Sequence, residues 1–237
     1  PTPPEGAKTQ IEQLGLGALF TSEFRGAKLQ YRVHPEDGCL NGVVARWNDG
    51  RRFRPMAGGD VMLDRGEGPA TVVSSRIEKG VLRVRWRQAG TPGGRGGAPH
   101  ALQWEADYSL RGCTLVVDVR CTGGAASGLT LGHVAGLRRP RGIEVPYLLM
   151  GPKPGPWIAC ADELFCSVLP DWYNSDFSAV DTAVTPPRGD RIGLLRGTTY
   201  GTLTDGRRNP LRDRILVTVS SEFADTLPNA RNPVSPN

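Results

Sequence analysis

The sequence is poor in the patterns that mark helices. None of its segments keeps a 3.6-residue apolar period over a dozen positions, and only Ser221 to Leu227, just before Pro228, has a helical pattern. Parallel strands need crossover connections, which are usually helices, so a parallel sheet is disfavoured. There is also no apolar run long enough to span a bilayer, so we expect no membrane partner.

Motifs for metal, nucleophilic or nucleic-acid chemistry are missing as well. The three histidines and five cysteines show no C-x-x-C or H-x-H spacing, which argues against zinc. No serine or cysteine stands in a recognisable nucleophile motif. The formal charge is +5, but only four of the 29 basic residues are lysines, and the arginines are scattered with no nucleic-acid-binding motif beside them. We therefore expect no nucleic-acid partner and no required cofactor.

The cysteines leave one pairing open. Cys113 and Cys121 lie on one predicted strand, roughly 26 Å apart at the rise of an extended chain, so they cannot bond to each other. Cys160 and Cys166 flank a predicted hairpin turn and could face each other across it. The alternative is that all five are small buried apolar side chains with free thiols.

Alternating apolar and polar residues predict strands along most of the chain. Val81 to Gln88 is an example, because Leu82, Val84 and Trp86 alternate with arginines that we expect on a solvated face. After a loose start, the predicted strands are Lys28 to Val33, Cys39 to Trp47, Val61 to Leu63, Ala70 to Ile77, Val81 to Gln88, Leu102 to Leu110, Thr114 to Cys121, Leu129 to Leu137, Ile143 to Met150, Trp157 to Ala161, Phe165 to Leu169, Arg191 to Tyr200 and Arg212 to Ser220.

These strands predict an all-β fold, a large antiparallel β-sandwich with one short C-terminal helical turn. Leu102 to Cys121 should form a long hairpin, and the last two strands a second one. The chain shows no internal repeat, which argues against a propeller or solenoid. We expect residues 1 to 237 to form one domain of a longer polypeptide, because Pro1 is not a methionine and both ends are rich in proline.

The stretch from Ile143 to Ser178 concentrates special chemistry in two loops. Residues 151 to 157 (GPKPGPW) hold three prolines, which fix φ and remove backbone donors, and end on Trp157. Residues 170 to 178 (PDWYNSDFS) pack carboxylates, an amide, hydroxyls and three aromatic rings into nine positions. Because buried polar groups without partners are costly, we expect this second loop to line a wet cleft or to meet another polar surface.

The second loop supports two hypotheses. In sugar recognition, aromatic rings pack on sugar faces while carboxylates and amides bind hydroxyls; the residues in these roles would be Trp157, Trp172, Tyr173, Asn174 and Asp176. In the alternative, the loop is a surface turn that caps its own backbone while Trp172 and Phe177 fill the core. A sugar platform requires Trp157 or Trp172 to be exposed, whereas a docking surface would show a broad apolar patch.

The acidic residues of this loop allow two further site chemistries. Asp171 and Asp176 could form a glycosidase pair, which needs carboxyl groups about 5 to 9 Å apart, but such pairs usually stand on rigid strand ends. We therefore predict no catalytic residue in this chain. Calcium could bind the oxygen ligands in the run of Asp171, Asn174, Asp176, Ser178 and Asp181, although the spacing is not that of an EF-hand.

Three stretches carry a family resemblance: Leu102 to Cys121, Ile143 to Ser178, and the exit segment from Asn209 to Pro236. Together they resemble the galactose-mutarotase-like β-supersandwich modules that precede the catalytic barrel in large bacterial glycosidases. The resemblance covers most of the chain but includes no diagnostic catalytic motif. In such proteins the supersandwich shapes one wall of the substrate cleft or buttresses the barrel, which supplies the catalytic carboxylates.

The resemblance implies an accessory carbohydrate-binding or scaffold domain. It also implies a catalytic domain after Asn237, tied to the exit segment by Arg212 or Arg214. The sequence does not specify the compartment; the carbohydrate hypothesis favours a periplasmic or secreted location. A competing class is an interaction module without a sugar site.

A free-standing mutarotase or epimerase would instead need a histidine acid and a glutamate base. His34 lies in a turn, His100 follows a glycine-rich loop, and nothing pairs Glu144 with a histidine. His133 shares its strand face with leucines, which favours a buried structural role.

Overall fold

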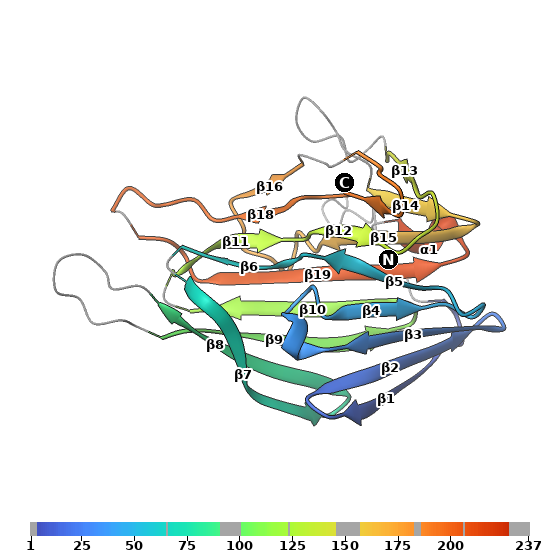
Figure 1. Cartoon of the computed structure of the whole chain (residues 1–237), viewed down its shortest axis with the longest axis horizontal. Coiled ribbons are helices and arrows are strands. Elements are labelled where there is room, and N and C mark those ends of the chain that lie inside the picture. The colour runs from blue at the N-terminus through green and yellow to red at the C-terminus, as the bar shows by residue number, and fades with distance from the viewer. Residues whose placement is uncertain are drawn as a thin grey trace, which may run out of the picture.

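The computed structural model describes residues 4–64, 66–90, 101–122, 124–145, 157–182, 186–205 and 207–227. Within these ranges the chain is built of antiparallel strands, with one 3₁₀ turn, η1 (Pro35–Asp37), and one short α-helix, α1 (Phe223–Thr226) (Figure 1). The strands form three sheets of eight, seven and four members, none of which closes into a barrel. The prediction of an all-β antiparallel sandwich with a short C-terminal helical turn is confirmed.

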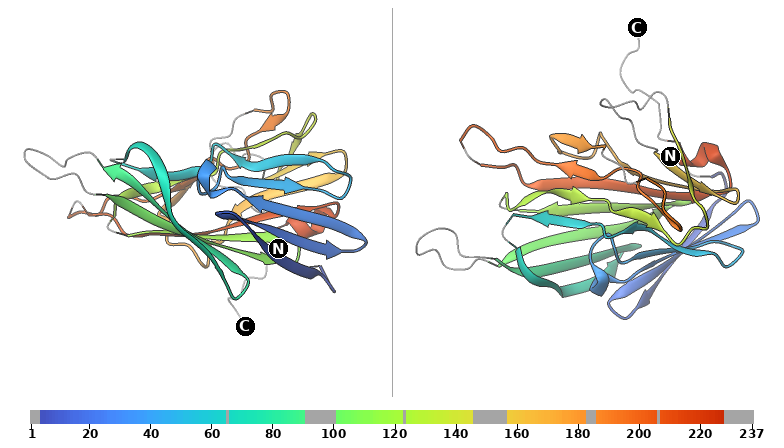
Figure 2. Two further views of the ribbon diagram at one scale, coloured as in Figure 1. Left: turned by 60° about the horizontal axis from the view of Figure 1, so that its bottom comes forward. Right: turned by 45° about the horizontal axis from the view of Figure 1, so that its top comes forward.

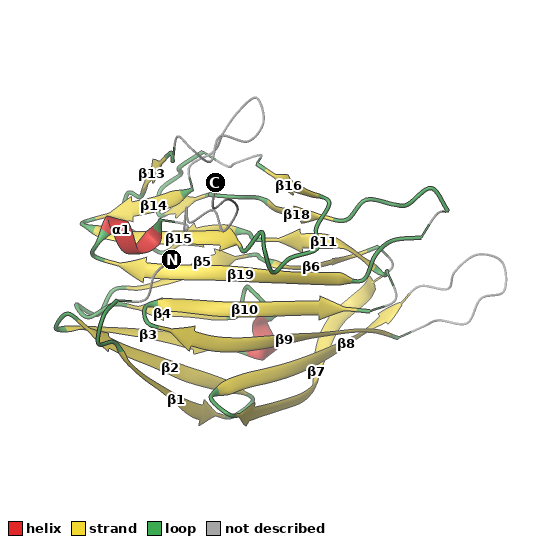
Figure 3. Ribbon diagram, turned by 180° about the vertical axis from the view of Figure 1, so that it is seen from behind, coloured by secondary structure: helices red, strands yellow, loops and turns green. Residues whose placement is uncertain are grey.

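The eight-stranded sheet forms one layer. Figure 3 views the molecule with this sheet toward the reader. The alternation read from the sequence is confirmed in it, since Leu82, Val84 and Trp86 are all buried. The long hairpin is also confirmed, with Arg111 opposite Thr114 at its turn. The strands of this sheet are, in spatial order, β13 (Arg141–Ile143), β14 (Ile158–Ala161), β15 (Leu164–Pro170), β19 (Leu211–Ser220), β10 (Thr114–Cys121), β9 (Leu102–Arg111), β8 (Val81–Gly90) and β7 (Gly66–Glu78).

The seven-stranded and four-stranded sheets form the other layer. The seven-stranded sheet has the order β1 (Lys8–Leu14), β2 (Gly17–Phe24), β3 (Ala27–Val33), β4 (Val43–Arg46), β5 (Arg52–Ala57), β12 (His133–Ala135) and β17 (Arg191–Ile192). The four-stranded sheet has the order β16 (Ala179–Asp181), β18 (Gly197–Thr199), β11 (Ala126–Thr130) and β6 (Asp60–Leu63).

Three segments of chain run through both of these sheets and bend between them. The order β5, β12, β17 in one sheet matches β6, β11, β18 in the other, and Figure 1 shows β5 continuing into β6. At the bend of the middle segment Gly132 has φ +66°, and a Cβ there would lie 2.2 Å from the carbonyl oxygen of Ala57. Only glycine fits this position, because it combines left-handed backbone with close backbone approach.

The two layers pack face to face around one hydrophobic core (Figure 2). Polar tips of large core side chains cross between the layers to backbone carbonyls. Tyr31 Oη on β3 lies 2.9 Å from the carbonyl oxygen of Cys113 and 3.0 Å from that of Val217, beside β10 and on β19. From the eight-stranded sheet, Trp86 Nε1 donates to the carbonyl of Pro35 at 2.9 Å. Buried aromatic residues of this kind fix the layers laterally because each hydroxyl or N–H needs its partner.

Two sequence predictions about strands are wrong. The start of the chain is not loose, because β1 and β2 form a hairpin with Lys8 opposite Glu23. The last two predicted strands do not pair with each other: β18 lies between β11 and β16, whereas β19 lies between β10 and β15. Both errors concern long-range pairing or polar edge strands, which local alternation does not specify.

The suggested Cys160–Cys166 contact is also wrong. In the β14–β15 hairpin Cys160 lies opposite Phe165, and Cys166 lies opposite Ala159. The two thiols therefore belong to different cross-strand pairs, whose side chains project to opposite faces of the sheet. All five cysteines are free, and every one except the half-buried Cys160 is buried.

Candidate functional site

The polar loop of residues 171 to 178 connects the two layers. It leaves β15 and continues along β19, where the backbone N–H of Asp171 donates to the carbonyl of Arg214 at 2.7 Å, and that of Asp176 donates to the carbonyl of Arg212 at 2.9 Å. The N–H of Ser178 then donates to the carbonyl of Thr199 at 2.8 Å, just before the chain enters β16. The loop is therefore held by main-chain hydrogen bonds at both ends.

The side chains of the loop brace it further. Asp171 accepts hydrogen bonds from the N–H of Tyr173 at 3.2 Å and from Asn174 Nδ2 at 2.8 Å. Ser175 Oγ accepts one from the N–H of Arg214 at 2.9 Å. This is the self-capping that the surface-turn hypothesis expected, and it uses both carboxylate oxygens of Asp171.

The aromatic rings of the loop do not all enter the core. Phe177 is partly buried against the core, and Trp172 meets it edge to face with ring centroids 5.1 Å apart. Trp172 is nevertheless 36% exposed, and Tyr173 beside it is 68% exposed. The other exposed large apolar side chains described are separate in the sequence, at Leu16, Val73, Leu203 and Phe223. The loop thus presents two adjacent aromatic residues to solvent on a braced backbone.

Trp157 does not join these rings. It is only 2% exposed and belongs to the hydrophobic core, so the expectation that it offers a stacking face is at odds with its burial. Its loop partners, residues 151 to 156, lie outside the described residues. Of the five residues predicted to bind sugar, the structure brings together Trp172, Tyr173, Asn174 and Asp176.

A buried carboxyl group lies beneath the loop. Asp213 is 1% exposed and points inward from β19, where Thr198 Oγ1 donates to its Oδ2 at 2.5 Å. Tyr200 Oη lies 2.7 Å from its Oδ1. Burial raises the pKa of Asp213 above its ordinary value, the two hydroxyls oppose that shift, and the charge of Asp176 adds to it. No arginine, lysine or histidine in the described part of the chain forms an ion pair with Asp213.

The hydrogen count around Tyr200 points to a neutral Asp213. Tyr200 Oη accepts from the N–H of Arg212 at 2.9 Å and lies 3.0 Å from the carbonyl oxygen of the same residue. A hydroxyl has only one hydrogen to give, so it cannot donate both to that carbonyl and to Asp213. All these contacts are hydrogen bonds if Asp213 carries the proton and donates it to Tyr200.

The sequence contained a signal for Asp213 that was missed. Within β19, Leu211, Asp213 and Ile215 alternate on the inward face, so an acid stands at a core position. In this segment only the flanking arginines, Arg212 and Arg214, were predicted to have a role, as a tie to another domain. In the structure Arg214 is bound within its own sheet, where its Nε and Nη2 donate to the carboxylate of Asp118 at 2.7 and 3.0 Å. Arg212 points outward and is exposed.

Arg214 belongs to a set of paired charges on the outer side of the eight-stranded sheet. Arg83 donates to Asp107 at 2.7 and 2.8 Å, and Arg120 donates to the same carboxylate at 2.5 Å. Glu105 adds contacts of 3.1 Å to Arg85 and 3.7 Å to Arg120. We call this surface the acid-paired face; its members are Arg83, Arg85, Glu105, Asp107, Asp118, Arg120 and Arg214.

Neither of the other proposed site chemistries gains geometric support. In the loop, Asp171 is occupied by internal hydrogen bonds, while Asp176 acts electrostatically on Tyr200 and Asp213 below. Ser178 Oγ accepts from the N–H of Gly201, and Asp181 lies 3.5 Å from Arg196. The described ranges contain no group of three or more histidine, cysteine or acidic residues placed to hold a metal.

The histidine–glutamate arrangement of a mutarotase is not assembled either. His133 is half-buried rather than buried, and its pKa is lowered by burial and by Arg191, with Asp190 opposing. No contact joins it to Glu144 in the part of the chain that the structure describes. His34 precedes η1, and His100 lies outside the described residues.

Comparison with known proteins assigns no family to this chain. No protein-family model and no curated protein matches the chain. This chain is similar to one chain of a solved structure, a glycoside hydrolase family 97 enzyme from Pseudoalteromonas sp. strain K8 in complex with panose. The sequence identity is 8% and the TM-score is 0.37. The match covers 94% of this chain and 36% of that chain, so this chain spans about a third of that enzyme. A likeness this weak concerns the general fold alone.

In the described ranges, no helix has the length and apolar character needed to cross a bilayer.

Proposed function

We propose that this chain is an accessory carbohydrate-contacting module, with the loop of residues 171 to 178 as its contact surface. Trp172 and Tyr173 stack on sugar rings, while Asn174 and Asp176 bind hydroxyl groups. The observation that carries this proposal is the exposure of two adjacent aromatic residues on a loop fixed to β19 by backbone hydrogen bonds. Aromatic rings held in place bind a flat ligand face without paying for the ordering of a mobile loop.

The competing function is a docking module without a sugar site. A docking surface of useful size would present a contiguous apolar patch of several hundred Å². The exposed large apolar residues described are instead scattered, apart from Trp172 and Tyr173. The amide and carboxylates beside these two rings favour a polar, hydroxyl-rich ligand over an apolar protein surface.

A matched pair of variants tests the proposal. Trp172 and Phe223 are exposed to nearly the same extent, 36% and 37%, and each makes one edge-to-face contact, with Phe177 and Phe165 respectively. On a glycan array we expect the native chain to bind one class of glycan, Trp172→Ala to weaken binding about tenfold, and Phe223→Ala to leave it unchanged. Equal weakening by both variants, or no glycan bound by the native chain, would overturn the proposal.

We further propose that the module serves a glycoside hydrolase whose catalytic carboxylates lie in another domain. The loop would then form part of a substrate cleft wall, or the sandwich would buttress the catalytic domain. In the full-length protein, Trp172→Ala should raise KM for the glycan with little change in kcat, because the ring contributes binding and no chemistry. A large fall in kcat with unchanged KM would place the loop in a different role.

A further inference from the structure

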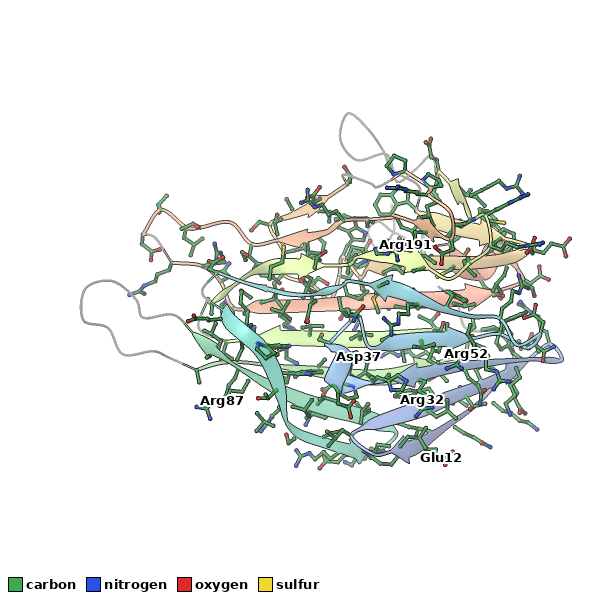
Figure 4. All side chains as sticks on the ribbon, in the orientation of Figure 1. Glu12, Arg32, Asp37, Arg52, Arg87 and Arg191 are labelled. Carbon is green, nitrogen blue, oxygen red and sulfur yellow. The ribbon has the colours of Figure 1, made fainter. Side chains whose placement is uncertain are left out.

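The outer side of the seven-stranded sheet carries arginines in a regular arrangement. Arg32 on β3 has Leu19 and Val44 as its cross-strand neighbours, and Arg54 and Arg191 flank Ala135 on β12. Arg46 on β4 lies directly opposite Arg52 on β5. We call this surface the unpaired arginine face; its arginines are Arg32, Arg46, Arg52, Arg54 and Arg191, and all are exposed. Figure 4 shows Arg32, Arg52 and Arg191 among them.

Three of the five arginines on this face have no internal counter-ion among the described residues, and the other two have only distant ones. Within the described residues, Arg32, Arg46 and Arg52 form no ion pair and no side-chain hydrogen bond. Arg54 approaches Asp37 only to 3.8 Å, and Arg191 approaches its chain neighbour Asp190 only to 3.8 Å, with all four side chains about half exposed or more. Contacts of that length and exposure neutralise little charge.

Such an arrangement costs stability in the free protein. Like charges directly opposite each other on neighbouring strands destabilise a sheet, and the Arg46–Arg52 pair is of this kind. The eight-stranded sheet shows that this chain can surround outward arginines with acids. A face on which three of five arginines have no acid partner, and the other two only partners at 3.8 Å, is suited to an external anion, which would supply the missing negative charge.

We propose that the unpaired arginine face binds a linear polyuronate, a polysaccharide with a carboxylate on successive sugars. The arginines span five neighbouring strands from β3 to β17, a distance of about 19 Å at the usual strand spacing, which suits an extended polymer. Guanidinium groups match carboxylates in a two-bond geometry that lysine cannot reproduce. The site is separate from the loop of residues 171 to 178.

Other polyanionic partners fit this face less well. Single-stranded nucleic acid is usually held by aromatic stacking as well as by charge. Protein partners usually bury aromatic or large apolar anchors at the centre of the interface. None of the exposed large apolar residues described lies on a strand of the seven-stranded sheet. The positions between the arginines are instead small or half-buried, as at Val44 and Ala135.

The test measures binding of polygalacturonate to the native chain and to two double variants. Arg46→Gln with Arg52→Gln removes two charges from the face, whereas Arg76→Gln with Arg87→Gln removes two exposed charges from the eight-stranded sheet. We expect the first variant to weaken binding about tenfold and the second by less than about twofold, since long-range charge is screened by salt. Fully methyl-esterified polygalacturonate, which lacks the carboxylates, should not bind the native chain.

Three outcomes would overturn the proposal. They are no binding of polygalacturonate by the native chain, equal weakening in both double variants, or equally tight binding of poly-glutamate or single-stranded DNA, which would make the face a general polyanion surface. Folding of the first variant is checked by its melting temperature, which should be no lower than that of the native chain. Trp172→Ala should retain polygalacturonate binding, so failure of the loop proposal and failure of this one are distinguishable.

Discussion

Arg120 and Arg46 point outward from interior strands of the two layers, and each lies opposite another arginine on one side, Arg212 and Arg52 respectively. On the other side they differ: Arg120 faces Glu105, whereas Arg46 faces Gln30. Arg120 also reaches Asp107 at 2.5 Å. The eight-stranded sheet therefore balances Arg83, Arg85, Arg120 and Arg214 from within, whereas the seven-stranded sheet leaves Arg32, Arg46 and Arg52 for something outside the chain. The same residue type stabilises the fold on one face and supplies a binding surface on the other.

The largest expected effect comes from removing the acid at the centre of the acid-paired face. Asp107→Asn leaves Arg83 and Arg120 without the carboxylate that both contact, so we expect a loss of about 2 kcal/mol in the free energy of unfolding. Asp37→Asn, on the other layer, removes only an exposed 3.8 Å contact and should cost less than about 0.5 kcal/mol. Urea denaturation measures both; equal costs would erase the distinction between the two faces.

The pH dependence of stability distinguishes Asp107, which is ion-paired, from Asp213, which has only hydrogen-bond partners. Burial opposes ionisation of Asp107, but Arg83 and Arg120 outweigh it and lower the pKa of Asp107 below its ordinary value. The unfolded chain then binds more protons, so this contribution is lost as pH falls through the folded-state pKa. The pKa of Asp213 is raised, so the folded chain binds more protons, and stability falls as pH rises from the ordinary value of 3.8 through the raised one.

Asp213→Asn tests this second sign. The amide mimics the neutral acid toward Tyr200 and Thr198 and does not ionise, so the fall of melting temperature with rising pH in that range should become smaller. Asp107→Asn should remove the opposite trend. A steeper fall in the Asp213 variant would show that the buried carboxyl is ionised in the native state.

Replacing an amide by a carboxylate on one face, and a carboxylate by an amide on the other, has a smaller effect on stability. Gln30→Glu places a carboxylate opposite Arg46 and should add about 0.5 kcal/mol to stability, while Glu105→Gln on the other face should remove a similar amount. Gln30→Glu should also weaken polygalacturonate binding, because it supplies the charge from within. Thermal unfolding and a binding titration of the two variants check these opposite signs; a destabilised Gln30→Glu would mean that Arg46 is already neutralised.

The smallest effect is the response to salt. Screening weakens repulsion on the unpaired arginine face and attraction on the acid-paired face, so the net change in melting temperature is small in the native chain. In Arg46→Gln the repulsive part is reduced, and added salt should then lower the melting temperature more than it does in the native chain. An identical salt response in both would indicate that the Arg46–Arg52 repulsion contributes nothing measurable.

Sequence patterns predicted the features that depend on neighbouring residues. The alternation around Trp86 and in the hairpin from Leu102 to Cys121 specified which faces are buried, because strand side chains alternate strictly. The partners of β18 and β19 could not be read in this way, since they are chosen by contacts far away in the sequence. The first hairpin was missed because β1 is largely exposed and lacks a clear apolar face, although β2 contributes Phe20 and Phe24 to the core.

At the candidate site, too, the sequence predicted local features but not contacts between distant segments. The loop composition drew attention to Trp172 and Tyr173, but it did not specify that these two rings are exposed while Phe177 is partly buried against the core. Trp157 looked equivalent in sequence and is buried. The hydrogen bonds of Asp213 with Thr198 and Tyr200 form because β18 lies next to it in the fold, and no spacing along the chain predicts that contact.

The position of β19 has a consequence for synthesis of the protein. This strand lies between β10 and β15 in the interior of the eight-stranded sheet, yet it comes after all the other strands of the described residues in chain order. Until Leu211 to Ser220 has been made, β10 and β15 present unpaired edges, and exposed edges are templates for pairing with other chains. Contacts between segments so distant in sequence also form slowly. A growing chain therefore keeps these two edges exposed to misassembly until β19 has been made, and a chain shortened before Leu211 would keep that vulnerability permanently.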